Sequence, residues 1–312
     1  MSLFRKVPTV VTRAARHSLI AMIAAIGVGL GAFQAAAQDA GAGAGHDDAA
    51  AEGEAETTHY PIKKPELFDW SFAGVFGTYD PAQLQRGFHV YRQVCSQCHG
   101  IKYVAFRNLS EPGGPGFSTE QVAALAAEYE VADGPDESGE TFTRPGRASD
   151  RFPSPFPNDQ AAAAVYGVAP PDLSLMAKAR GAPRGPLWTV IDFFTQYQEA
   201  GPNYIHALLT GYGEEPHAGV TVPPGTYYNP YFLSGAVIAM PPPLADGDVK
   251  YTDGSPLTVD QYSEDVSAFL MWTAEPHLVA RKRLGFQVII FLAVFATLMY
   301  LTKRRVWEAV AH

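Results

Sequence analysis

The sequence predicts a mainly α-helical domain with long loops rich in proline and glycine, followed by one C-terminal transmembrane helix. Helix-start signals precede three segments in which apolar residues recur every three or four positions. Alternation of apolar and polar residues, the sign of a half-buried strand, is scarce. The chain holds 25 prolines and 29 glycines, many of them in connections such as residues 144–159 and 221–232. Loops this long need a central object on which to pack.

The first predicted helix begins after Asp80 and leads into the two cysteines of the chain. Asp80 suits the N-cap, Pro81 the first helical position, and Gln83 would complete a capping box. The following residues then recur on one helical face: Leu84, Phe88, Tyr91 and Cys95. We therefore expect an amphipathic helix whose C-terminal end presents the cysteine motif.

Two further helices are predicted from the same kind of signal. Ser118 and Gln121 form a potential capping box before residues 118–131. Thr258 and Gln261 do so before the third segment, which Pro276 should end or kink just before the C-terminal apolar run.

The N-terminus, residues 1–37, has the charge order of a secretory signal peptide. An apolar run from Leu19 to Phe33 follows the basic residues, and Ala35 and Ala37 fit an A-x-A cleavage site. An uncleaved membrane anchor is the alternative, but the run is short and interrupted by glycines. Residues 38–59 are rich in alanine, glycine and acid and predict a flexible acidic leader.

The C-terminal apolar run predicts a single membrane anchor over residues 281–305. Residues 284–301 carry no charge and would reach about 27 Å as a helix, close to the thickness of a bilayer core. Three basic residues lie on each side, so the positive-inside rule does not set the orientation. Export of the N-terminus sets the orientation instead. The body is expected in the periplasm, anchored to the bacterial inner membrane, with residues 306–312 as a cytoplasmic tail.

The body between the two apolar runs is strongly acidic. Residues 38–280 hold 31 acidic and 13 basic residues, a net charge of −18 with histidine neutral. Such a surface argues against nucleic-acid binding, which needs basic groups against phosphate. It is suited to attract a cationic partner, although a merely soluble surface would have the same composition.

The motif Cys95-Ser-Gln-Cys98-His99 predicts covalent attachment of one c-type haem. A redox disulfide of this spacing belongs near a β-α-β pattern, which is missing, and a structural zinc usually needs a second cysteine pair. Two thiols one helical turn apart can add to the vinyl groups on one porphyrin edge, and the adjacent imidazole then faces the iron. We therefore expect a cytochrome c-type haem domain over residues 60–280.

Met240 is the best candidate for the second axial ligand. It lies directly before three prolines, and such a stiff loop can hold a thioether on the iron. A packing role for Met240 and ligation by a histidine, of which His206 is the best candidate, stay open at this point. His/Met ligation would raise the haem potential and close both axial positions, as electron transfer requires.

From residue 66 to about residue 307 the chain resembles the cytochrome c1 family, the haem subunits of ubiquinol:cytochrome c reductase. The similarity lies in these segments, in order: "RGFHVYRQVCSQCH", "YVAFRNL", "PPDLSLMAKAR", "LLTGYGEEP", "AMPPPL" and "FLMWTAEPHLVARKRLG". The resemblance implies thioether links at Cys95 and Cys98 and axial ligation by His99 and Met240. It also implies propionate contacts by Arg180 and Tyr204 and packing of Pro171 on the haem.

Two features depart from the family pattern. Residues 181–203 form a longer link than usual between Arg180 and Tyr204, and their aromatic content predicts a packed helix, against a neighbouring subunit. Some bacterial relatives brace the methionine region with a disulfide, but here both cysteines are assigned to the haem.

The resemblance implies an electron carrier that works beside cytochrome b, accepts electrons from the Rieske iron–sulfur protein and passes them to a soluble or tethered cytochrome c. Six acidic residues could attract a basic acceptor, although an ordinary solvated loop would have the same composition: Glu128, Glu130, Asp133, Asp136, Glu137 and Glu140. A free-standing, membrane-tethered cytochrome c shuttle is the main alternative. A haem peroxidase or gas sensor is another, but it would need an open sixth position.

Overall fold

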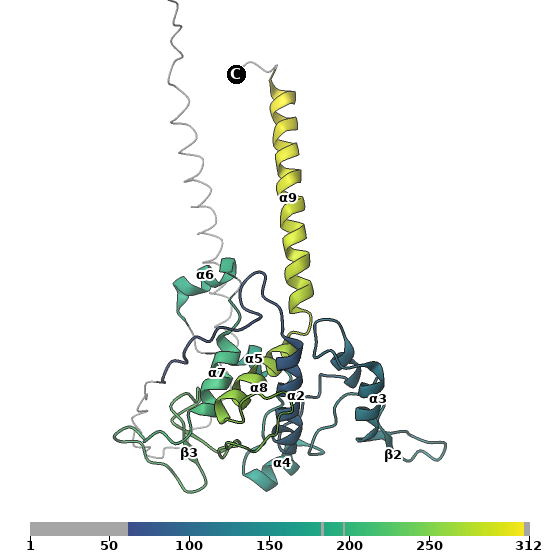
Figure 1. The fold of residues 1–312 in the computed structure, drawn as a ribbon, viewed down its shortest axis with the longest axis vertical. Coiled ribbons are helices and arrows are strands. Elements are labelled where there is room, and N and C mark those ends of the chain that lie inside the picture. The colour runs from purple at the N-terminus through teal and green to yellow at the C-terminus, as the bar shows by residue number, and fades with distance from the viewer. Residues whose placement is uncertain (1–61, 182–183, 196, 309–312) are drawn as a thin grey trace, which may run out of the picture. The chain divides into compact units, whose positions relative to one another are not determined.

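The computed structural model describes residues 62–181, 184–195 and 197–308 as a mainly helical fold (Figure 1). The predicted signal peptide and acidic leader lie outside the described residues. In chain order the elements are α2 (Pro81–Gln93), η1 (Cys95–Gln97), η2 (Phe106–Ser110), α3 (Thr119–Ala127), β1 (Glu130–Asp133), β2 (Phe142–Pro145), α4 (Asp159–Tyr166), α5 (Met176–Ala179), α6 (Pro186–Thr195), α7 (Ala200–Thr210), β3 (Tyr227–Tyr228), β4 (Val237–Ile238), α8 (Val259–Ala274) and α9 (Leu278–Trp307).

Strand structure in the described ranges is limited to two small antiparallel pairs. β1 pairs with β2, and the two-residue strands β3 and β4 pair with each other. The rest of the body is helix and ordered loop, so the predicted fold class is confirmed.

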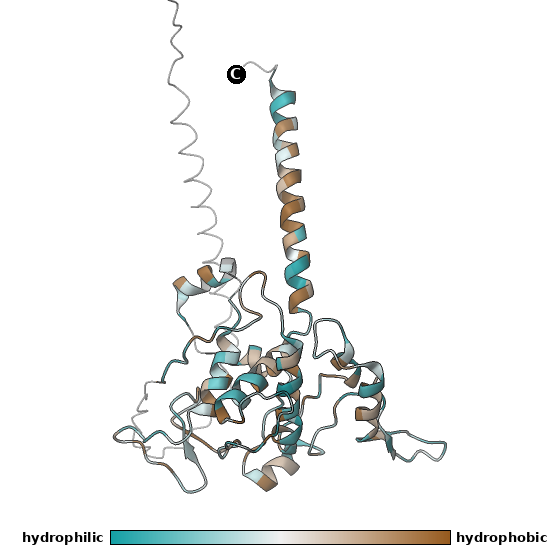
Figure 2. Ribbon diagram, viewed as in Figure 1, coloured by the Kyte–Doolittle hydropathy of each residue, from teal (hydrophilic) through white to brown (hydrophobic). Residues whose placement is uncertain are grey.

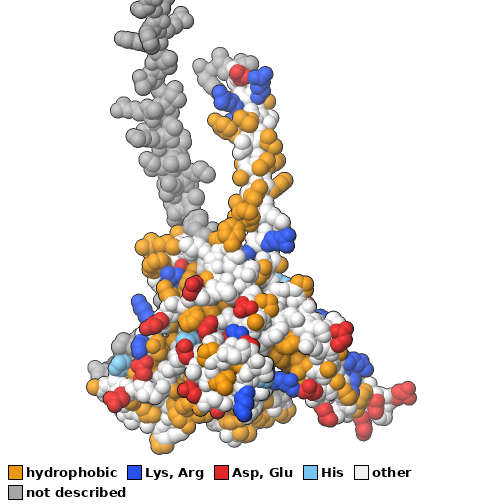
Figure 3. All heavy atoms as spheres, viewed as in Figure 1, with side chains coloured by type: hydrophobic (Ala, Val, Ile, Leu, Met, Phe, Trp, Pro, Cys, Tyr) orange, Lys and Arg blue, Asp and Glu red, His pale blue; other side chains and the backbone are white. Residues whose placement is uncertain are grey.

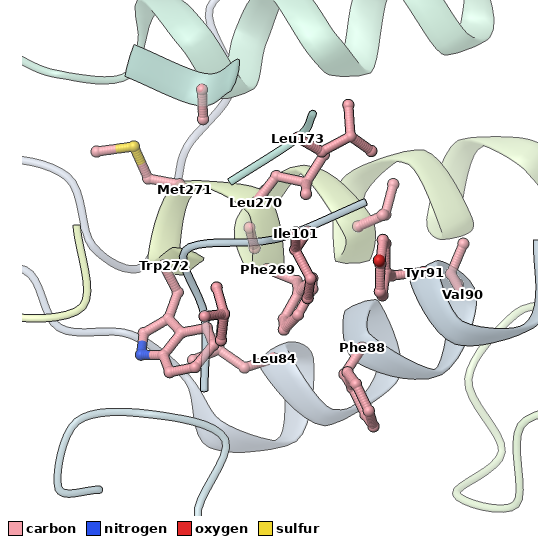
Figure 4. Close-up of a cluster of buried hydrophobic side chains, with 14 of the residues drawn as sticks. Leu84, Phe88, Val90, Tyr91, Ile101, Leu173, Phe269, Leu270, Met271 and Trp272 are labelled. Atoms are coloured by element: carbon pink, nitrogen blue, oxygen red, sulfur yellow. The ribbon is translucent and has the colours of Figure 1, made fainter. Parts of the chain in front are cut away.

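The core forms where α2 crosses α8, the helix next to the C-terminal anchor. Gly87 lets the two backbones approach closely, because a Cβ built on it would lie 2.0 Å from the carbonyl oxygen of Asp265. Beside this crossing the rings of Phe88 and Phe269 lie 5.6 Å apart. Figure 4 shows these aromatic side chains with the fully buried Ile101 and Trp272 between the two helices and the neighbouring loops. The haem motif therefore follows a helix that is fixed along its length.

The predicted start of α2 is confirmed, but its capping box is wrong. Asp80 accepts a hydrogen bond from the backbone amide of Ala82 at 3.0 Å. The Gln83 side chain does not return to the N-cap, because its Nε2 donates to Glu264 on α8 at 2.7 Å. At α3 both bonds of the predicted capping box between Ser118 and Gln121 are present.

The capping box predicted at α8 is only half formed. Thr258 accepts from the backbone amide of Gln261 at 3.3 Å, whereas the Gln261 side chain donates to Asp265. α8 ends at Ala274, two residues before Pro276, as expected.

The predicted helix in residues 181–203 is confirmed as α6, and the first residues of α7 complete the segment. Leu187, Trp188 and Val190 on α6 are exposed rather than buried within this chain. The guanidinium of Arg184 lies 4.4 Å from the Trp188 ring centroid and 4.0 Å from that of Tyr197.

α9 is the one helix in the described ranges that is long and apolar enough to cross a membrane. Figure 2 shows an apolar middle section with hydrophilic residues toward both ends. At its base Lys282 is buried and donates to the carbonyl oxygen of Phe72 at 2.7 Å. The N-terminal part of α9 is thereby attached to the loop that precedes α2.

Candidate haem-binding site

The two cysteines and His99 lie on one tight turn at the C-terminal end of α2. The backbone amides of Cys98 and His99 both donate to the carbonyl oxygen of Cys95, at 3.1 and 2.8 Å. Both thiols are free, so the C-x-x-C pair is not a disulfide. A turn of this kind presents two sulfur atoms and one imidazole from five consecutive residues.

The imidazole of His99 is oriented by the backbone of the loop that follows α4. Its Nδ1 lies 2.7 Å from the carbonyl oxygen of Pro171. A carbonyl oxygen only accepts, so Nδ1 carries the proton and Nε2 keeps a lone pair. Burial lowers the pKa of His99, and the bond to Pro171 opposes that shift. The neutral ring with a free Nε2 is the form that ligates a metal.

Asp172 holds this loop in place beside the motif. Its Oδ2 accepts from the backbone amide of Lys102 at 2.9 Å, and its Oδ1 accepts from that of Ser174 at 3.0 Å. The backbone amide of Leu173 also donates to the carbonyl oxygen of Gly100 at 2.8 Å. Pro171 itself is exposed, and its carbonyl position depends on these neighbours. Sequence reasoning did not find the role of Asp172, since no spacing rule links it to His99.

Tyr166 at the end of α4 also contacts the motif, and it too was missed from the sequence. The Sγ of Cys98 and the hydroxyl oxygen of Tyr166 lie 3.2 Å apart. A single exposed tyrosine in a loop-rich region carries no sequence signal for such a contact.

Met240 lies just after the β3–β4 hairpin, with its side chain half-buried. The hydroxyl of Tyr212 donates to its carbonyl oxygen at 3.0 Å. Three prolines then lead to Leu244, which is buried in the core. The backbone on both sides of the thioether is therefore fixed, as the proline run predicts.

Arg180 and Tyr204, predicted as propionate contacts, come from the end of α5 and from α7, two elements that pack against each other. Tyr204 on α7 is 4% exposed, and Arg180 directly follows α5. Burial raises the pKa of the Tyr204 hydroxyl, and a hydrogen bond to the Leu233 backbone and the positive charge of Arg180 oppose the shift. No ion pair of Arg180 occurs among the described residues, so its guanidinium is available for an anionic group.

The other candidate axial ligands have different surroundings. Met271 is fully buried in the core, and Met176 is partly buried and packs against the core cluster. His206 Nε2 lies 3.0 Å from Asp260 Oδ1, and its ring contacts Phe68. The ring of His217 lies edge-on to Tyr228, 6.0 Å between centroids.

The donor set fits a covalently attached haem better than the alternatives. Within the described ranges no group of three or more His, Cys, Asp or Glu side chains is arranged to hold a metal ion, so the two thiols have no further zinc ligands there. Two unpaired thiols, an oriented neutral imidazole and a thioether in a rigid loop are the groups that a c-type haem requires.

Comparison with known proteins gives a consistent family. The sequence model described as "Cytochrome C1 family" matches residues 70–310. The chain is 61% identical over 245 residues to a protein of Bradyrhizobium diazoefficiens named cytochrome b/c1, covering 78% of this chain and 36% of that protein. It therefore spans only about a third of that relative. It is 48% identical to cytochrome c1 of Blastochloris viridis, covering 79% and 87% of the two chains. Mitochondrial cytochrome c1 of Saccharomyces cerevisiae is 44% identical, with 78% and 72% covered. The resemblance inferred from the motifs is confirmed: the chain belongs to the cytochrome c1 family.

Proposed function

We propose that the protein is the haem-bearing electron carrier of a ubiquinol:cytochrome c reductase, taking electrons from a Rieske iron–sulfur protein and passing them to a soluble or tethered cytochrome c. The observation that carries the proposal is the oriented imidazole of His99, whose Nδ1 lies 2.7 Å from the Pro171 carbonyl oxygen, in a chain of the cytochrome c1 family. The name of the Bradyrhizobium relative joins cytochromes b and c1 in one protein, which supports cytochrome b as a partner.

Each residue of the site has a defined task in this proposal. Cys95 and Cys98 would hold one haem c covalently through their sulfur atoms, and His99 Nε2 and Met240 Sδ would bind its iron. A haem bound there supplies a one-electron Fe(III)/Fe(II) couple. With both residues bound to the iron, the two rigid ligand loops would exclude oxygen and peroxide from it.

The remaining site residues bind the periphery of the haem. The Arg180 guanidinium would match a propionate carboxylate with charge-assisted hydrogen bonds, and the Tyr204 hydroxyl is the second predicted contact of that group. Pro171 would pack on the haem.

The chain is arranged across the bacterial inner membrane in this proposal. Residues 1–37 direct export, residues 38–59 are a leader, and residues 60–280 form the haem domain in the periplasm. Residues 281–305 cross the membrane, and residues 306–312 lie in the cytoplasm. The exposed apolar side chains of α6 provide a surface for a neighbouring subunit.

The decisive experiment is extraction of the full-length protein from its native membrane in mild detergent. We expect a b-type cytochrome and a Rieske protein to co-purify, and ubiquinol to reduce the c-type haem of that assembly within one turnover. A free-standing shuttle would instead purify without a b-type cytochrome and would not be reduced by quinol alone.

The β1–β2 hairpin provides a test of acceptor attraction. Glu128 and Asp133 pair with Arg92 and Arg144, and Asp136 accepts bonds within its own loop. The other three carboxylates of the predicted six are exposed and make neither an ion pair nor a side-chain hydrogen bond in the described ranges: Glu130, Glu137 and Glu140.

Replacing Glu137 and Glu140 by glutamine is expected to lower the second-order rate of oxidation by a basic cytochrome c. The loss should be greatest at low ionic strength and vanish at high salt, because salt screens steering. Stopped-flow mixing measures the rate, and Glu66→Gln with Asp69→Asn makes the same charge change elsewhere. Equal rates and salt slopes in the two variants would rule out steering by the hairpin.

Asp172→Ala is expected to raise the midpoint potential, because the loosened Pro171 carbonyl no longer makes the His99 imidazole electron-rich. Removal of the negative charge of Asp172 also raises the midpoint potential. Asp172→Asn removes the charge but keeps an acceptor oxygen, so the difference between the two variants isolates the positioning effect. Redox titration measures the midpoint potential of each variant. Identical potentials in the two variants would show that only the lost charge, and not the position of the Pro171 carbonyl, changes the potential.

A further inference from the structure

A short apolar loop contacts the first turns of the uncharged section of α9. It comprises residues 73–77 and follows the buried Phe72. Its tip residues Val75 and Phe76 are 39% and 76% exposed. The Phe76 ring nevertheless packs edge-on against Phe286 of α9, with 5.5 Å between ring centroids.

The contact with Phe286 fixes the depth of the loop relative to the anchor. The uncharged run begins at Leu284, so Phe286 lies only about 3 Å into it at the rise of an α-helix. Phe76 therefore lies level with the outermost apolar turn. Figure 3 shows hydrophobic side chains along α9 and on the body beside its base.

The loop is held in this position by polar contacts on its backbone. Lys282 from α9 donates to the carbonyl oxygens of Phe72 and Gly74. The backbone amide of Gly74 in turn donates to the buried carboxylate of Glu199 at 3.3 Å. The loop is thus attached both to α9 and to the start of α7.

The two glycines of the loop allow its tight turn. Gly74 has φ +64°, in the left-handed region that favours glycine. A Cβ on Gly77 would lie 2.0 Å from the carbonyl oxygen of Ala73, so a side chain there would open the turn. The exposed aromatic tip is consequently presented by a rigid turn.

We propose that residues 75–76 enter the lipid headgroup and outer acyl region beside α9, which gives the haem domain a second membrane contact. The proposal rests on α9 crossing a membrane, as in the proposed function. The exposed Phe76 ring contacts a membrane helix at the level of its first apolar turn. A ring at this level is surrounded by lipid rather than by water. Arg283, exposed on α9 just before its uncharged run, adds attraction to anionic headgroups.

A nitroxide label at residue 76 tests the proposal directly. With Cys95 and Cys98 bound to haem, Phe76→Cys carries the single thiol open to labelling. The labelled full-length protein, in its native assembly, is reconstituted in phosphatidylcholine–phosphatidylglycerol vesicles. Collisions with oxygen, which concentrates in lipid, and with a water-soluble nickel chelate are measured by electron paramagnetic resonance. Val75→Cys serves as a second label site, and an unchanged haem spectrum shows that each variant is folded.

Two control sites bracket the result. Phe142→Cys on β2, 47% exposed, is expected to collide mainly with the nickel chelate, and Val294→Cys in the middle of α9 mainly with oxygen. We expect the oxygen-to-nickel ratio at residue 76 to be severalfold above that at residue 142.

A nickel-accessible label at residue 76, as at residue 142, would overturn the proposal. So would protection from both reagents, which would mean that a protein subunit covers the loop. A nickel-accessible label at residue 294 would instead refute the membrane span itself.

Discussion

Met240→Leu is expected to abolish the near-infrared sulfur–iron band of the oxidised protein and to lower the midpoint potential greatly. Leucine fills a similar volume but offers no donor atom, so an iron held by Met240, as proposed, would lose the thioether that stabilises its reduced form. Axial ligands set haem potentials over roughly 0.8 V, and the fall should take up a substantial part of that range. The opened position should also bind carbon monoxide when the haem is reduced, which the native protein should not.

Met176→Leu is the matched control, since it removes a thioether that packs against the core. Its near-infrared band and potential should equal those of the native protein. A native spectrum in Met240→Leu would exclude this ligand. His206 would then be the best remaining candidate for the second ligand, and its bond to Asp260 would have to break before it could bind iron.

Gly87→Ala is expected to lower the free energy of unfolding by about 2 kcal/mol or more. The new methyl group would meet the Asp265 carbonyl oxygen at 2.0 Å and the Cβ of Phe269 at 2.7 Å, so α2 and α8 must separate. Overpacking costs about 1–3 kcal/mol, occasionally more, and outweighs the gain of up to about 1 kcal/mol in helix propensity. The unfolding temperature should fall by roughly 5 °C or more.

Thermal unfolding followed by circular dichroism measures this effect in the purified protein. Gly285→Ala is the control, because it makes the same change within a helix where nothing lies within 4 Å of the new atom. We expect it to leave the unfolding temperature of the body unchanged. If Gly87→Ala were equally neutral, the close crossing of α2 and α8 would not be a packing constraint.

Local signals in the sequence predicted the elements that depend on neighbouring residues. The N-cap at Asp80, the capping box at Ser118 and the stop before Pro276 are each set within a few positions, and all three are present. The spacing of Cys95, Cys98 and His99 likewise fixed one tight turn of the candidate site.

Contacts between distant segments could not be predicted in the same way. Gln83 failed as a capping residue because Glu264, far along the chain, accepts its amide proton. Asp172 supports the loop that orients His99, and Phe76 contacts Phe286. Both contacts form only because folding brings distant segments of the chain together. No period or spacing encodes such pairs, so only the folded chain reveals them.

The junction between α8 and α9 is three residues long, and Glu275 within it bonds both Lys178 and Arg281, at 2.9 and 2.6 Å. Tyr79 adds hydrogen bonds to the carbonyl oxygens of Met271 and Glu275. A tether this short and cross-linked leaves the body little freedom to move or tilt relative to α9. In the proposed function, the haem would therefore stay at a nearly constant distance from the bilayer surface for every protein that exchanges electrons with it.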